Sequence, residues 1–192
     1  HIIFSITKSM AALLVGVLVG RGRLNPQDLV TDYLPELAGS AYDGARLRHL
    51  LDMQIASSFS ENYTDRDGIF MDYRRAAAWN PVEEGVETEG LRHFLTQMPK
   101  SDTAQHGRLH HYCSPHSDVL GWVIERAGNA SFAEQFSEHI LAPCGGSHTG
   151  YITLDTYGAP RVSGGMCLGL YDLSLIGEMV RNRGYINQLQ VV

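Results

Sequence analysis

Ser5 and Lys8 are the first residues along the chain whose types and spacing could do chemistry. They form a Ser-x-x-Lys pattern that runs into an apolar stretch starting at Met10. Residues three apart share one face of a helix, so a helix here would bring the hydroxyl within hydrogen-bond reach of the amine. A neutral amine can take the proton of a serine hydroxyl, and burial favours the neutral form of a lysine. The pair is compatible with a nucleophile and its base, but such a four-residue pattern alone is more often a capping serine beside a solvated lysine.

A third group with suitable chemistry lies far downstream, at Tyr112. Ser114 and Pro115 follow it, and this order is typical of a helix start with serine as the cap and proline at the first helical position. Tyr112 is therefore expected on the turn before a helix. A phenol beside a cation can relay a proton from the base to a leaving group.

Helices dominate the elements expected to position these groups. The first should run from Ser5 to Gly20, and a polar, irregular loop should cover 54–68. Trp79 and Trp122 are expected in the core. Further helices are expected at 25–34, 46–53, 72–79 and 88–95, from 114 and from 131, and at 170–181, with a short strand at 151–154 and a glycine turn at 163–166.

With both motifs in place, the chain resembles the serine β-lactamase and penicillin-binding-protein superfamily. Within that superfamily it is most similar to the esterase and amide-hydrolase branch that contains the 6-aminohexanoate-dimer (nylon-oligomer) hydrolases. The stretches that carry the resemblance occur in the same order along nearly the whole chain: 4–9, 49–53, 60–63, 112–114 with 118–122, and 163–165 with 172–173. The resemblance implies an α+β fold of the β-lactamase/transpeptidase type. Residues 1–192 would be one partial catalytic domain, mainly helical and without the flanking sheet strands.

The resemblance also implies roles for individual residues. Ser5 would be the nucleophile, Lys8 the base and Tyr112 the proton relay, while Tyr63 and Ser114 would contact the substrate. The implied reaction is hydrolysis of a carboxylic ester or small amide through an acyl-enzyme, with no metal or organic cofactor.

The chain departs from the superfamily pattern in three ways. Ala56 stands where the branch usually has glycine, and Ser114 stands where true β-lactamases favour Asn, which favours an esterase or amidase. The third motif, a Lys- or His-x-Gly strand that supplies an oxyanion donor, does not occur in 1–192. Two alternatives therefore stay open: a β-lactamase or D-alanyl-D-alanine carboxypeptidase, and an inactive piece or penicillin-recognising module of the same fold.

Composition narrows the possible partners. A formal net charge of -6 argues against a nucleic-acid-binding surface, and an apolar fraction of 44% is that of an ordinary globular protein. The longest apolar run, 10–20, is about half of the roughly 20 residues that cross a bilayer, so no membrane span is predicted. The expected partner is a small molecule, and the sequence predicts no oligomeric state.

The ends of the chain and its cysteines give hints about the parent protein and its compartment. The sequence has neither an initiator Met nor a signal peptide, so we expect a piece of a longer protein. The cysteines, Cys113, Cys144 and Cys167, are odd in number and are expected to be free thiols. Free thiols slightly favour the cytoplasm, although the ends of the chain do not identify the compartment.

Four histidines near Tyr112 raise the question of a zinc site. Zinc needs three or four converging ligands, and adjacent histidines point apart. A polar rim is the simpler interpretation, and no metal is predicted. The histidines are His106, His110, His111 and His116.

Overall fold

The computed structural model describes residues 1–80, 85 and 87–192. It confirms a mainly helical chain, in which the described strands are only two residues long. The helical elements are α1 (Ile6–Gly20), α2 (Val30–Tyr33), η1 (Pro35–Leu37), α3 (Leu47–Leu51), α4 (Ile69–Ala76), α5 (Gly90–Thr96), α6 (Ser114–Gly128), α7 (Phe132–Phe136), η2 (Ser137–Leu141) and α8 (Leu170–Arg181).

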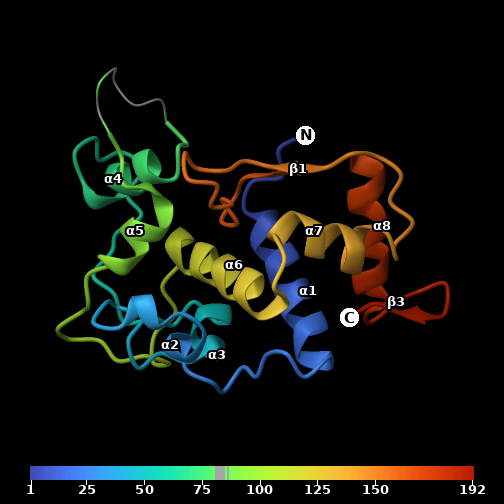
Figure 1. Cartoon of the computed structure of the whole chain (residues 1–192), viewed down its shortest axis with the longest axis horizontal. Coiled ribbons are helices and arrows are strands. Elements are labelled where there is room, and N and C mark those ends of the chain that lie inside the picture. The colour runs from blue at the N-terminus through green and yellow to red at the C-terminus, as the bar shows by residue number, and fades with distance from the viewer. Residues whose placement is uncertain (81–84, 86) are drawn as a thin grey trace.

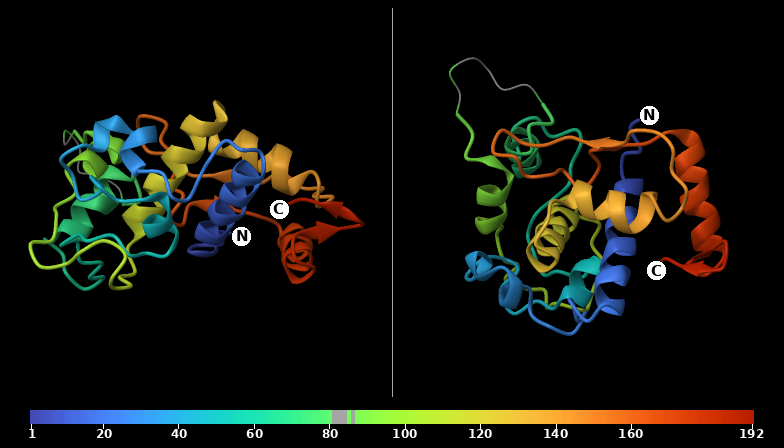
Figure 2. Two further views of the ribbon diagram at one scale, coloured as in Figure 1. Left: turned by 90° about the horizontal axis from the view of Figure 1, so that it is seen from below. Right: turned by 45° about the vertical axis from the view of Figure 1, so that its right-hand side comes forward.

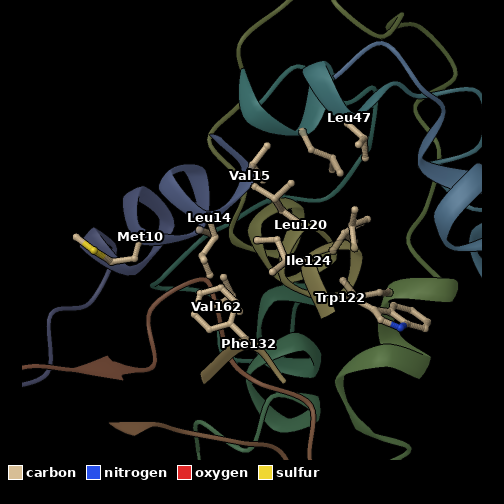
Figure 3. Packing of buried hydrophobic residues seen from close by; sticks show 14 of the residues in the cluster. Met10, Leu14, Val15, Leu47, Leu120, Trp122, Ile124, Phe132 and Val162 are labelled. Carbon is tan, nitrogen blue, oxygen red and sulfur yellow. The ribbon is translucent and has the colours of Figure 1, made fainter. Parts of the chain in front are cut away.

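Helices α1 and α6 pack against each other at the centre of the molecule (Figure 1). Leu14 and Val15 of α1 are buried, as are Leu120 and Ile124 of α6, and Figure 3 shows these side chains gathered between the two helices. α2 to α5 lie on one side of this pair, and α7 and α8 lie on the other (Figures 1 and 2). Burial of these apolar faces is the main contribution to the stability of the core.

A small antiparallel ribbon crosses the start of α1. β1 (Tyr151–Ile152) pairs with β2 (Met166–Cys167), and Ile2 bridges to Cys167 on the other side of β2. The Ile3 N–H donates to the Met166 carbonyl at 2.9 Å. The first residues of the chain are thereby fixed beside β2, and they lead directly into Ser5.

A second ribbon, β3 (Tyr185–Ile186) with β4 (Leu189–Gln190), follows α8 at the edge of the molecule. Of the expected elements, the first helix and 170–181 are confirmed almost to the residue. All three cysteines are buried free thiols, as expected.

The expected helix at 25–34 was wrong in its first half, because α2 begins only at Val30. The Asn25 side chain accepts from the Gln27 N–H in a local turn instead of capping a helix. The Pro26 carbonyl accepts from the Arg48 N–H, and the Asp28 carbonyl accepts from the Leu47 N–H. This pairing with a distant segment replaces the local helical hydrogen bonds.

Two other helix starts also differ from expectation. α4 begins at Ile69 rather than 72, and α5 begins at Gly90 without a side-chain cap from Thr88. No helix in the described ranges is both long enough and apolar enough to cross a bilayer.

Candidate active site

The backbone makes a strained turn immediately before Ser5. Phe4 has φ of 44°, a left-handed conformation that bulky residues rarely adopt, and Ser5 then stands at the N-cap of α1 with φ of −64°. Hydrogen bonds on both sides hold the turn, from Ile3 to β2 and from the Thr7 N–H to the Phe4 carbonyl at 2.9 Å. The Ser5 side chain is exposed and faces a cavity, where a ligand could reach it.

Three residues that the sequence singled out meet at the Ser5 hydroxyl. Lys8 Nζ lies 3.2 Å from Ser5 Oγ, which is the one-turn contact expected on α1. The Tyr112 hydroxyl donates to the same Oγ at 2.7 Å, and Lys8 Nζ lies 5.2 Å from the centre of the Tyr112 ring. An activated nucleophile needs this contact between its hydroxyl and a base.

Lys8 is half-buried, so the burial that the apolar run makes plausible is only partial. The reason is that α1 turns its apolar face toward α6 and leaves the Ser5 and Lys8 face toward the cavity. Lys8 Nζ also donates to the backbone carbonyl of Ser163, which fixes the amine next to Ser5.

A buried polar network holds Ser163 in place. Its N–H donates to one Asp118 carboxylate oxygen at 2.8 Å, and the Tyr73 hydroxyl donates to the other at 2.6 Å. The hydroxyls of Tyr73 and Ser163 lie 2.7 Å apart. Asp118 on α6 therefore positions Lys8 indirectly. It holds Ser163, and the Ser163 carbonyl accepts a hydrogen bond from the Lys8 amine. No local pattern in the sequence indicates Tyr73, because its partner Asp118 lies 45 residues away along the chain.

The position of Asp118 predicts a specific pH dependence of stability. Burial raises the pKa of this carboxyl from 3.8 to about 6, against the opposing effect of the hydrogen bonds it accepts. Between these two pH values the folded protein binds a proton that the unfolded chain has released, so this group lowers the free energy of unfolding as pH rises. Two pH units correspond to about 3 kcal/mol.

Asp118→Asn should remove that dependence, because an amide does not titrate. We expect the free energy of unfolding of the variant, relative to wild type, to rise by up to about 3 kcal/mol from pH 4 to pH 6. Urea unfolding of both proteins across this range measures the difference, and other titrating groups cancel in it. Parallel pH profiles would contradict the assignment.

The two residues expected to contact substrate lie close together. Ser114 N–H donates to one Glu61 carboxylate oxygen at 2.7 Å, and Ser114 Oγ donates to the other at 3.0 Å. The Tyr63 hydroxyl donates to the same carboxylate. Partial burial and this bond to Glu61 raise the pKa of Tyr63. The expectation that Ser114 caps α6 was wrong: Cys113 is the N-cap, because Glu61 takes both Ser114 donors.

Tyr63 and Ser114 line a cavity of about 270 Å³ together with Ser5. Its other lining residues are Phe4, Trp79, Arg161, Ser163 and Gly164. Trp79 is half-buried: it packs against the core and also lines this cavity, whereas Trp122 is buried as expected. The sequence reasoning did not identify Arg161. An arginine shortly before a glycine turn was the only signal available.

Comparison with known proteins identifies the family of this chain. The family model described as Beta-lactamase matches residues 1–166. The 6-aminohexanoate-dimer hydrolase of Paenarthrobacter ureafaciens is 32% identical over 184 residues, which cover 96% of this chain and 46% of that protein.

The chain belongs to the Beta-lactamase family.

Solved structures show the same fold for this Beta-lactamase family chain. A Bacillus anthracis protein provisionally assigned as a 6-aminohexanoate-dimer hydrolase superposes with a TM-score of 0.89 at 21% identity, covering 100% of this chain and 50% of that one. The octameric penicillin-binding protein homologue from Pyrococcus abyssi gives a TM-score of 0.75 at 22% identity, covering 100% of this chain and 46% of that one. The β-lactamase/transpeptidase-like fold is thus confirmed, and the chain spans about half the length of these relatives.

The histidines near Tyr112 serve separate purposes in this Beta-lactamase fold. His106 Nδ1 accepts from the Ala56 N–H at 3.0 Å, and His110 lies 3.2 Å from the Asp52 carbonyl. His116 is fully buried beside Tyr42, and burial lowers its pKa to about 3, so it is neutral at ordinary pH. In the part of the chain that the structure describes, no three His, Cys, Asp or Glu side chains gather as a metal site requires.

Proposed function

We propose that this Beta-lactamase family protein is a serine hydrolase that cleaves a carboxylic ester or small amide through an acyl-enzyme. The observation that carries the proposal is the position of Ser5 Oγ, 3.2 Å from Lys8 Nζ and 2.7 Å from the Tyr112 hydroxyl. The name of the Paenarthrobacter relative, a hydrolase of a 6-aminohexanoate dimer, supports an amide or related acyl substrate.

The proposed acylation step begins with attack of Ser5 Oγ on the substrate carbonyl. Lys8, as a neutral amine, accepts the hydroxyl proton, and Tyr112 passes a proton to the departing alcohol or amine. The bond from the carbonyl carbon to the leaving group breaks, and the acyl group stays on Ser5. A water molecule then attacks the ester on Ser5, its proton returns through the same groups, and the carboxylic acid departs.

The negative oxygen formed in each step needs hydrogen-bond donors. The N–H of Ser5 forms no hydrogen bond within the described residues, and its place at the start of α1 suits this role. Tyr63 and Ser114 would then contact the substrate from the wall of the cavity.

Labelling with a fluorophosphonate tests the proposal without any substitution. We expect one label per molecule, located on Ser5 by peptide mass spectrometry, because only an activated hydroxyl attacks the phosphorus. We also expect a p-nitrophenyl ester to be hydrolysed faster than a chromogenic cephalosporin. Absence of label at Ser5 would support a non-catalytic module of this fold, and faster cephalosporin hydrolysis would support a β-lactamase.

A further inference from the structure

Arg161 is a buried cation in the same cavity as Ser5, and the proposed reaction gives it no role. The residue is only 4% exposed. Burial lowers the pKa of the guanidinium, but arginine stays charged at neutral pH. A buried charge is costly unless it is paired, so the question is what pairs with it.

The described residues supply no direct partner for this charge. Nε of Arg161 is buried without a hydrogen-bond partner. No ion pair among the described residues includes Arg161. Asp118, whose charge acts on Arg161, already accepts from Tyr73 and Ser163. Glu61, which binds the lining residues Ser114 and Tyr63, is engaged by them.

The surroundings hold the guanidinium in one orientation. Its central carbon lies 3.8 Å from the centre of the Trp79 ring, a cation–π contact. A stacked guanidinium uses its face and leaves its in-plane N–H groups for an acceptor. The paired N–H groups of arginine match the two oxygens of a carboxylate.

The space next to Gly164 places this group close to the nucleophile. A Cβ atom built on Gly164 would lie 3.2 Å from Nη2 of Arg161 and 3.5 Å from the carbonyl carbon of Phe4. The guanidinium is therefore separated from the backbone that leads into Ser5 by little more than the width of one atom. Lys8 adds a second basic group to the same region.

We propose that Arg161, stacked on Trp79, is a carboxylate-binding subsite of the catalytic cavity, and that the preferred substrates are esters or amides that also carry a carboxylate. This inference rests on the proposed function, which it narrows to an anionic class of substrate. The volume of about 270 Å³ suits a short aliphatic acid.

Two esters of equal length test the preference in the wild-type protein. Mono-p-nitrophenyl adipate carries a free carboxylate, and p-nitrophenyl methyl adipate carries the same chain with that charge removed. We expect kcat/KM to be about 10- to 100-fold higher for the acid, mainly through KM, because a hydrogen bond to a charged group has this effect. Equal kcat/KM values would overturn the proposal.

Arg161→Met should abolish this preference, so that the ratio of kcat/KM for the acid to kcat/KM for the methyl ester falls to about 1. Arg108→Met, which removes an exposed arginine, is the matched control for net charge and should keep the preference. An equal loss on both esters in Arg161→Met would show a structural role instead and overturn the proposal.

Calorimetric titration separates failure of this inference from failure of the proposed function. Adipate should bind wild type at least tenfold more tightly than adipamide, and Arg161→Met should lose the difference. This measurement needs no turnover, so it tests the subsite even if neither ester is hydrolysed in a Ser5-dependent way. Equal binding of adipate and adipamide to the wild type would overturn the subsite and leave the hydrolase proposal standing.

Discussion

Ser5→Ala is expected to lower kcat for a p-nitrophenyl ester by roughly 10⁶-fold, the loss that follows removal of an activated serine nucleophile. The alanine keeps the backbone N–H and the start of α1 but removes the oxygen that lies between Lys8 and Tyr112. Steady-state hydrolysis measures the loss, with KM expected to change little because the cavity keeps its other lining residues.

Ser9→Ala is the matched control for this change. Ser9 is an exposed serine on the same helix, one turn beyond Ser5, and it is absent from the cavity lining. We expect its kcat to stay within about twofold of wild type. Similar turnover by the Ser5→Ala and Ser9→Ala proteins would reject Ser5 as the nucleophile.

Lys8→Met is expected to lower kcat by roughly 10⁴-fold, the upper end of the contribution of a positioned acid–base group. Methionine fills a similar volume but cannot take the hydroxyl proton, and it cannot donate to the Ser163 carbonyl. Fluorophosphonate labelling of Ser5 should slow by a comparable factor, since it requires the same proton transfer. Stopped-flow or long-time labelling measures that rate.

Lys100→Met provides the control, because Lys100 is the other lysine of the sequence. It is exposed and lies 3.5 Å from Asp43, away from the cavity. An exposed pair of this kind contributes little to stability, so we expect normal turnover. If the Lys8→Met protein unfolds like wild type and still turns over ester at a normal rate, another group must be the base.

The site depends on a long-range hydrogen-bond network that the spacing of Ser5 and Lys8 does not predict. Ser5 and Lys8 come from α1, but the carbonyl that holds Lys8 belongs to Ser163, and Asp118 on α6 holds Ser163. Among the described residues Asp118 forms no ion pair with Lys8 or with Arg161, and it acts on Lys8 only through Ser163. Its effect on catalysis is therefore one of positioning.

The sequence by itself determined the local elements and the pattern of groups that could do chemistry. The helix from Ile6 to Gly20 follows from its apolar residues, and the spacing of Ser5 and Lys8 follows from helical geometry. The helix expected from 131 has a local signal, because Ser131 and Glu134, three residues apart, form a capping box. The mainly helical fold and the free thiols followed from composition and periodicity.

Only the tertiary structure decided which distant groups meet. Asn25 and Ser114 looked like caps, but distant segments pair with the carbonyls that follow Asn25 and with both donors of Ser114. Trp79 packs against the core but also lines the cavity, where it stacks on Arg161. Helix signals depend on neighbours a turn apart, whereas burial, pairing and the shape of a cavity depend on packing between elements, and that packing has no local signature.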